Sequence, residues 1–164
     1  MIRYFAYGSN LCIAQMTARV GAFLLASPPC IARLGGHRLA FNMRADDGQV
    51  YANIHAPGDH VLGVLYWCAA NVFEKLDPFE AGYSRERILV DCDGEVVEAS
   101  AYKANPENIC DGGTPSAEYV ERILRGSRQH RFPEEYVRRI ESYAGSASSG
   151  TNASPGCASE LRRR

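Results

Sequence analysis

The spacing of apolar residues along the chain predicts a mixture of short strands and helices. Short runs rich in aromatic and β-branched residues, several of them alternating with polar residues, predict strands. The expected strands cover residues 2–7, 22–26, 38–42, 50–55, 61–68, 87–91 and 96–103. Apolar positions that recur every three or four residues predict helices. The expected helices cover residues 11–20 and 71–79, and two more begin at Thr114-Pro115 and at Pro133.

Glycine, proline and aspartate indicate how the strands are connected. Pro28-Pro29 interrupts the chain after the second expected strand. Pro57-Gly58-Asp59 predicts a turn that joins residues 50–55 and 61–68 as a strand pair. Asp93-Gly94 predicts the tight turn of a hairpin.

The order of these elements indicates an α+β fold. Strands and helices do not alternate strictly, as a doubly wound parallel sheet would require. The chain also lacks the G-x-G-x-x-G and G-x-x-x-x-G-K-[ST] fingerprints of nucleotide-binding proteins. Consecutive short strands with a few helices favour a mixed, curled sheet that has its helices on one side.

Length and local composition predict one folded domain followed by a tail. The 164 residues suffice for one domain with its own core. From Ala144 onward, small and polar residues prevail without periodicity, and the chain closes on three arginines. Such a segment buries too little apolar area to offset its ordering entropy. We therefore expect a domain over residues 1–143 and a mobile tail over residues 144–164.

Charge and hydropathy argue against several classes of partner. The 18 basic and 19 acidic residues give a net charge of -1, which offers no electrostatic footprint for nucleic acid or an anionic membrane. No window approaches 18 uninterrupted apolar residues, so no transmembrane helix is expected. The apolar run at the N-terminus is too short for a signal-peptide core. A cytoplasmic location is therefore expected.

The cysteines favour neither a disulfide framework nor a metal site. Six cysteines are spread along the chain with no C-x-x-C pair, so reduced thiols and no metal are expected. Cys12 follows the first strand-to-helix junction and could be a thiolate nucleophile at a helix N-terminus. No partner histidine can be named for it, so a packing role is the preferred interpretation.

Two places in the sequence could carry chemistry. Gly8-Ser9-Asn10 joins a strand to a helix, where Ser9 or Asn10 can cap the helix and free backbone N–H groups can hold a carboxylate or an oxyanion. Glu80 lies between aromatic residues at a helix end, where an apolar environment raises the pKa of a carboxyl group toward the range useful for proton transfer. Glu74, Asp77 and Glu86 are nearby, and spacing alone does not choose among these carboxylates.

The opening segment Tyr4-Phe5-Ala6-Tyr7-Gly8-Ser9-Asn10-Leu11 resembles the first strand and loop of the γ-glutamylcyclotransferase family. The similarity continues at residues 52–54, 57–59, 63–66, 76–80, 115–119 and 132–136, and so covers about residues 4–143. The Gly-Ser-Asn loop is more similar to the branch that acts on γ-glutamyl-amino acids than to the γ-glutamylamine branch, whose loop usually has Gly-Thr-Leu.

The resemblance implies a small α+β fold built round a mixed, partly closed β-barrel with a few helices. Family members convert γ-glutamyl-amino acids to 5-oxoproline and a free amino acid, without metal or cofactor. The carried-over general acid/base is Glu80. The carried-over substrate-binding residues are Tyr4, Phe5, Ala6, Tyr7, Gly8, Ser9 and Tyr119.

Two local departures from the family pattern stand out. The family usually has glycine directly after the catalytic glutamate, whereas here Ala81 precedes Gly82, so a different local turn is expected. Tyr83-Ser84-Arg85 matches a later family element only loosely and receives no role.

The resemblance implies an intramolecular reaction, and several alternatives remain open. In a γ-glutamyl compound the α-amine attacks the γ-carbonyl of the same molecule, so no protein nucleophile is needed. The expected partner is thus a small γ-glutamyl molecule, with a homodimer left open. The alternatives are a cyclotransferase for γ-glutamylamines or other γ-glutamyl metabolites, a non-catalytic ligand-binding relative, and a thiol-based redox protein.

Overall fold

A five-stranded closed barrel forms the centre of the molecule. The computed structural model describes residues 1–21 and 25–147. The barrel strands follow the order β1-β5-β2-β6-β7 around the wall. Their bounds are Ile2–Ala6 for β1, Leu25–Gly35 for β2, His60–Cys68 for β5, Tyr83–Cys92 for β6 and Glu95–Ala104 for β7. Tyr4 pairs with Ser100 in parallel between β1 and β7, which closes the barrel.

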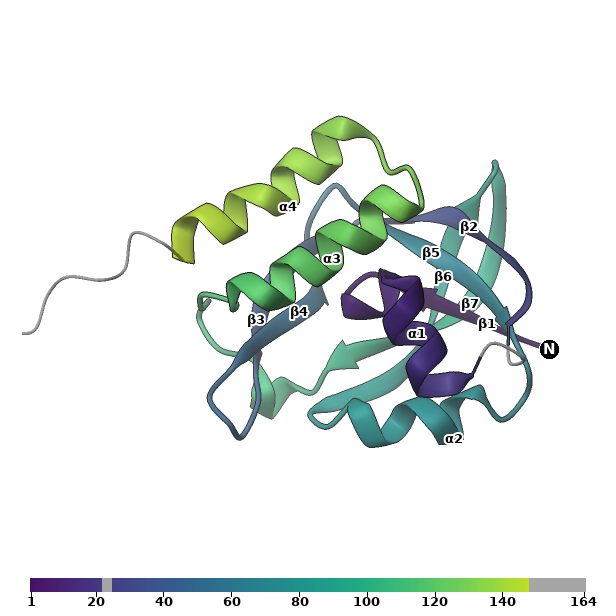
Figure 1. The fold of residues 1–164 in the computed structure, drawn as a ribbon, viewed down its shortest axis with the longest axis horizontal. Coiled ribbons are helices and arrows are strands. Elements are labelled where there is room, and N and C mark those ends of the chain that lie inside the picture. Colours follow the sequence, from purple (N-terminus) through teal and green to yellow (C-terminus); the bar gives the residue numbers. More distant parts are fainter. Residues whose placement is uncertain (22–24, 148–164) are drawn as a thin grey trace, which may run out of the picture.

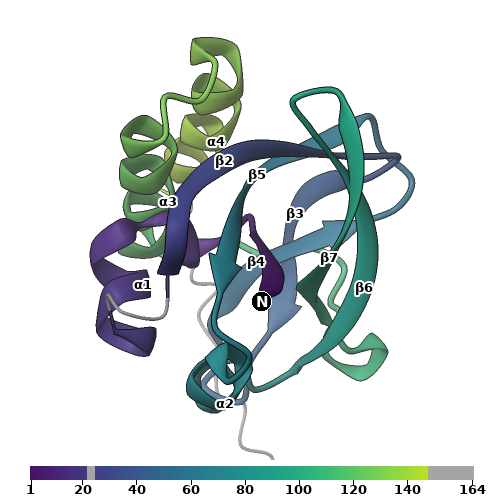
Figure 2. The same cartoon turned by 90° about the vertical axis from the view of Figure 1, so that its right-hand side faces the viewer.

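Helices cover one side of this barrel, as Figures 1 and 2 show for α1, α3 and α4. The α-helices are α1 (Ile13–Val20), α2 (Val72–Leu76), α3 (Ala117–Gln129) and α4 (Glu134–Ala147). Three short 3-10 turns, η1 (Ser9–Leu11), η3 (Asp77–Phe79) and η4 (Pro106–Asn108), complete the described helical elements. None of the described helices is long and apolar enough to span a bilayer. The predicted α+β class is confirmed.

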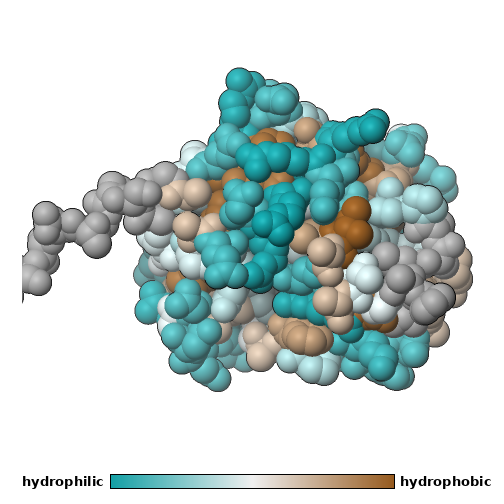
Figure 3. Space-filling view, viewed as in Figure 1, coloured by the Kyte–Doolittle hydropathy of each residue, from teal (hydrophilic) through white to brown (hydrophobic). Residues whose placement is uncertain are grey.

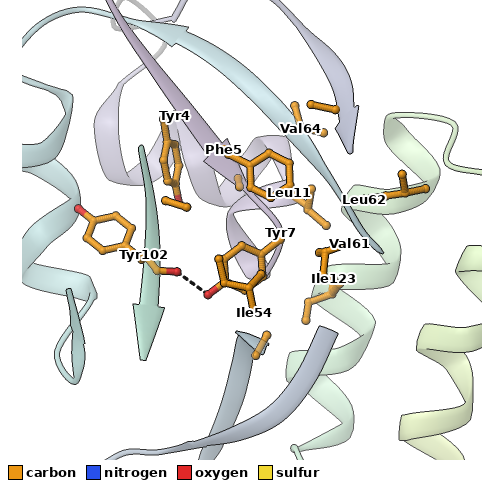
Figure 4. Packing of buried hydrophobic residues seen from close by; sticks show 14 of the residues in the cluster. Tyr4, Phe5, Tyr7, Leu11, Ile54, Val61, Leu62, Val64, Tyr102 and Ile123 are labelled. Carbon is orange, nitrogen blue, oxygen red and sulfur yellow. Dashed lines mark hydrogen bonds between the residues drawn. The ribbon is translucent and has the colours of Figure 1, made fainter. Parts of the chain in front are cut away.

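The strand β1 is buried on both faces, which explains its aromatic composition. Successive side chains of a strand point to opposite faces. Tyr4 packs against Tyr102 of the neighbouring strand β7, with ring centroids 5.9 Å apart, whereas Phe5 points to the other side of β1, where Leu11 and Ile123 lie (Figure 4). Tyr4 is 3% exposed and Phe5 0%. One short strand therefore buries aromatic side chains on both of its faces.

The predicted pairing of residues 50–55 with residues 61–68 is wrong. Residues 50–55 form β4 (Val50–His55), which pairs with β3 (Arg38–Arg44) in a separate two-stranded sheet. Strand β5 pairs with β1 on one edge and with β2 on the other, so neither edge is left for β4. We call the β3–β4 pair the outer hairpin.

The outer hairpin leaves and re-enters the barrel at a single point. Gly36 N donates to Asp59 O at 2.9 Å, and Gly58 N donates to Gly36 O at 3.1 Å. These bonds join the end of β2 to the start of β5. Asn53 of β4, which is 0% exposed, accepts from Ala104 N of β7 at 3.0 Å. The hairpin is thus tied to the barrel wall at its side as well as at its ends.

Other boundaries differ from the predicted ones by local chemistry. Strand β2 runs through Pro28-Pro29, with register shifts against β5 on the N-terminal side of Cys30, because bulges accommodate residues that cannot donate to the ladder. The strand expected over residues 22–26 lies partly outside the described residues. The β6–β7 hairpin is confirmed, with positive φ at both Asp93 and Gly94 as a two-residue turn requires.

Helix boundaries also shift. Ser116, not Thr114, is the N-cap of α3, and its hydroxyl accepts from Tyr119 N at 3.2 Å. Helix α4 continues to Ala147, past the boundary expected at residue 143. Residues 148–164 of the expected tail lie outside the described residues. The five described cysteines are free, and Cys12 is buried at 2% exposure, consistent with a packing role.

Candidate active site

A small cavity lies where the end of β1, the outer hairpin, the start of β6 and the first turn of α3 meet. We call it the inner cavity; its empty space, including the part open to solvent, is about 310 Å³. Its walls are mostly tyrosine rings and the loop after β1. The lining residues are Tyr4, Tyr7, Gly8, Ser9, Asn10, Ala52, Glu80, Tyr83, Tyr102 and Tyr119.

Among the described residues that line the inner cavity, Glu80 alone carries a carboxyl group. Its side chain is 13% exposed, and it follows the turn η3 at the end of α2. Burial raises the pKa of Glu80 to about 7 from an ordinary 4.5, although Arg19 and Asn10 act in the opposite direction. A carboxyl group with such a pKa can both take and return a proton near neutral pH.

Asn10 and Arg19 hold one oxygen of Glu80. Asn10 Nδ2 donates to Glu80 Oε1 at 3.1 Å, and Arg19 Nη1 lies 3.3 Å from the same oxygen. The two partners are also bonded to each other, since Arg19 Nη1 donates to Asn10 Oδ1 at 2.8 Å. Within residues 1–21 and 25–147, Glu80 Oε2 has no hydrogen-bond partner. This second oxygen is therefore available to a ligand.

Ser9 or Asn10 was expected from the sequence to cap a helix, but Asn10 does not do so. It lies inside η1, and α1 begins after Cys12 without a side-chain cap. Its amide is 5% exposed and also donates to Tyr4 Oη at 2.8 Å. The side chain that the sequence suggested as a cap thus connects Tyr4 to Glu80.

The loop after β1 offers backbone donors to the cavity. The turn η1 uses the carbonyls of Gly8 and Ser9, which accept from Leu11 N and Cys12 N. In the described part of the chain, no acceptor is assigned to the N–H groups of Gly8, Ser9 and Asn10. All three residues line the inner cavity. Such unpaired amides suit a carboxylate or an oxyanion.

Tyrosine hydroxyls complete the polar lining. Tyr119 Oη accepts from Ala52 N at 3.2 Å, and Tyr83 Oη donates to Ala52 O at 2.6 Å. Burial raises the pKa of Tyr119 to about 12 and that of Tyr4 well above its ordinary value. These hydroxyls therefore keep their protons at neutral pH. Tyr4 and Tyr119 accept in the bonds described above, so their own protons can point to a ligand.

The structure brings together six of the eight residues expected from the sequence: Tyr4, Tyr7, Gly8, Ser9, Glu80 and Tyr119. Phe5 and Ala6 do not line the cavity. Phe5 lies on the opposite face of β1 from Tyr4, and Ala6, at 1% exposure, is enclosed in the core beside its ladder partner Val64. The expected role of these two residues in the substrate-binding loop therefore stays a prediction, with no side chain in the cavity lining to support it.

Sequence reasoning missed Arg19, Ala52, Tyr83 and Tyr102. The contact of Arg19 with Glu80 joins positions 61 apart, and no local pattern distinguishes Arg19 from other arginines. Tyr83 belonged to a segment that resembled the family loosely, which was a usable signal.

Gly82 has φ +87, so the tight turn after Glu80 depends on residue 82 and accommodates Ala81.

The described residues contain no group of three or more His, Cys, Asp or Glu side chains that could hold a metal ion. Cys12, the alternative nucleophile, does not line the inner cavity. The polar groups present are one carboxyl of raised pKa, one cation paired with it, backbone amides and protonated tyrosines. This set suits proton transfer beside a developing negative charge.

Comparison with known proteins gives a consistent result. A family model described as the AIG2-like family matches residues 60–140. A γ-glutamylcyclotransferase of Bos taurus is 26% identical over 151 residues, which cover 85% of this chain and 77% of the bovine protein. A solved γ-glutamyl cyclotransferase structure has a TM-score of 0.75 at 26% identity and 86% coverage of each chain. The crystal structure of an uncharacterised Homo sapiens protein has a TM-score of 0.73 at 25% identity, with 97% and 94% coverage. The resemblance of this chain to the γ-glutamylcyclotransferase family is therefore confirmed in both sequence and fold.

Proposed function

We propose that this protein is a γ-glutamylcyclotransferase that converts γ-glutamyl-amino acids to 5-oxoproline and a free amino acid. The observation that carries the proposal is Glu80, a largely buried carboxyl of raised pKa beside a loop of unpaired amides. The solved relative named as a γ-glutamyl cyclotransferase and the bovine protein support the same reaction class.

The first step closes a ring within the substrate. The α-amine nitrogen attacks the γ-carbonyl carbon, and Glu80 Oε2 takes a proton from that nitrogen. Because nucleophile and carbonyl belong to one molecule, positioning contributes about 7–11 kcal/mol relative to a bimolecular reaction. The negative charge that develops on the γ-carbonyl oxygen is stabilised by the N–H groups of residues 8–10.

The second step releases the amino acid. The tetrahedral intermediate collapses, its C–N bond to the leaving amine breaks, and Glu80 returns the proton to that nitrogen. The products are 5-oxoproline and the free amino acid, and the enzyme ends in its starting protonation state. Arg19 and Asn10 hold Oε1, so that Oε2 keeps one position during both transfers.

The test is release of 5-oxoproline from a panel of γ-glutamyl compounds, with Glu80→Gln as the control. Glutamine keeps the shape and the Asn10 contact but cannot carry the proton. We expect turnover with the wild type and none above background with the variant, while substrate binding persists. Near-normal product release by the variant would refute the role of Glu80. Binding of γ-glutamyl compounds without product formation by the wild type would instead support a non-catalytic relative.

A further inference from the structure

A second hollow adjoins the inner cavity. We call it the outer pocket; its empty space, including the part open to solvent, is about 770 Å³. It shares Ser9, Glu80, Tyr83 and Tyr119 with the inner cavity. Because the two hollows meet at Glu80, a γ-glutamyl group in the inner cavity directs the rest of its molecule into the outer pocket.

The outer pocket has an apolar side and a cationic side. Met43, Tyr51 and Phe79 supply apolar and aromatic surface. Arg19 and Arg122 supply positive charge, and Glu80 is the only acidic residue among the described ones that line it. Glu80 already pairs with Arg19. Among the described lining residues, Arg122 therefore carries a positive charge that no lining carboxylate balances.

Arg122 is oriented toward the site by Gln15. Arg122 Nη1 donates to Gln15 Oε1 at 2.9 Å, and Gln15 Nε2 donates to Ser9 Oγ at 2.6 Å. The guanidinium side chain is 35% exposed, so it is held between the protein and solvent. Helix α3 supplies both Arg122 and Tyr119, one turn apart, to the same hollow.

The present partner of Arg122 is easily displaced. Arg122 Nη2 donates to Glu118 Oε1 at 2.7 Å in an i,i+4 pair on the helix surface. The Glu118 side chain is 84% exposed, and such surface pairs are weak. The face of the molecule that carries α3 is mainly hydrophilic (Figures 1 and 3). Because the Glu118 side chain is already mostly in solvent, it can turn away from Arg122 at little cost. A guanidinium has five N–H donors, and these two bonds leave others free.

We propose that Arg122 binds the carboxylate of the leaving amino acid and thereby selects γ-glutamyl-amino acids over γ-glutamylamines. This inference rests on the proposed function. A carboxylate meets a guanidinium through short, charge-assisted bonds, which an amine without a carboxylate cannot make. Arg122 is thus a specificity-determining residue and takes no part in proton transfer.

The test uses two substrates that differ only by the carboxylate, γ-glutamyl-alanine and γ-glutamyl-ethylamine. We expect Arg122→Gln to raise KM for γ-glutamyl-alanine about tenfold, the effect of losing one charged hydrogen bond, with little change in kcat. Its KM for γ-glutamyl-ethylamine changes by less than about twofold, because no bond is lost. Glu118→Gln acts in the opposite direction, lowering KM for γ-glutamyl-alanine only.

The matched control is Arg125→Gln on the same helix. Arg125 is exposed and does not line the outer pocket, and the substitution changes the net charge equally. We expect it to alter neither substrate's kinetics. Equal losses with both substrates in Arg122→Gln, or the same loss in Arg125→Gln, would overturn the inference while leaving the proposed function intact. If the wild type released 5-oxoproline from neither compound, both the role of Arg122 and the proposed function would be overturned.

Discussion

Replacing Glu80 by glutamine is expected to change the pH dependence of stability as well as to stop turnover. The side chain is 13% exposed, and its burial raises the pKa of Glu80 to about 7 from an ordinary 4.5. Between these two values the folded protein keeps a proton that the unfolded chain has released. The contribution of Glu80 to stability is therefore greatest below pH 4.5 and is lost as the pH rises through 7.

The size of this loss follows from the two pKa values. Each pH unit that separates them corresponds to about 1.36 kcal/mol. Between pH 5 and pH 8 the linkage relation gives a loss of about 2.5 kcal/mol in the free energy of unfolding. Glutamine at this position does not titrate, so the variant lacks this loss.

The assay is urea unfolding of the wild type and Glu80→Gln at pH 5, 6, 7 and 8. Titration of every other group occurs in both proteins and cancels when the two curves are subtracted. We expect the difference in unfolding free energy to move by about 2.5 kcal/mol in favour of the variant over this range. Parallel curves would show that Glu80 is not desolvated, and the proposed proton transfer would lose its physical basis.

Three further predictions concern the groups around Glu80. In the wild type, we expect kcat/KM to fall about tenfold per pH unit below pH 6. Arg19→Gln removes the charge that lowers the pKa of Glu80, so it should shift this acidic decline of the rate to higher pH. An unshifted decline in the pH–rate profile would contradict the ion pair between Arg19 and Glu80. Gly8→Ala places a Cβ 3.2 Å from Tyr119 Oη, so we expect a higher KM that Tyr119→Phe partly restores in the double variant; additive effects would argue against this contact. Tyr119→Phe alone leaves Ala52 N without its acceptor and should cost about 1–3 kcal/mol in thermal unfolding, whereas an unchanged midpoint would show that water replaces the hydroxyl.

Local patterns predicted most elements of the fold but not how distant strands pair. The Asp93-Gly94 hairpin was predictable because the turn itself selects the register. The partner of β4 was not, because residues 57–59 form a turn whether the next strand pairs with β4 or with β2. That choice depends on which barrel edges are already filled, which no short segment encodes.

The candidate site divides in the same way. The loop at residues 4–9 and Glu80 were expected because they lie in contiguous segments that resemble the family. The pair between Arg19 and Glu80 was not, since it depends on how α1 lies against the turn after α2. Asn10 shows a third situation, in which a residue suited to local capping is used for a contact 70 positions away.

The outer hairpin has a consequence for how this scaffold can change over evolutionary time. Its two ends meet through the backbone of Gly36, Gly58 and Asp59, so the segment between them is an insertion between two strands of an already closed barrel. Tyr51 and Ala52 of the outer hairpin line the two hollows, yet neither residue takes part in the strand pairing of the barrel. Substitutions in the outer hairpin can therefore change the range of substrates, while the strands of the barrel remain unchanged.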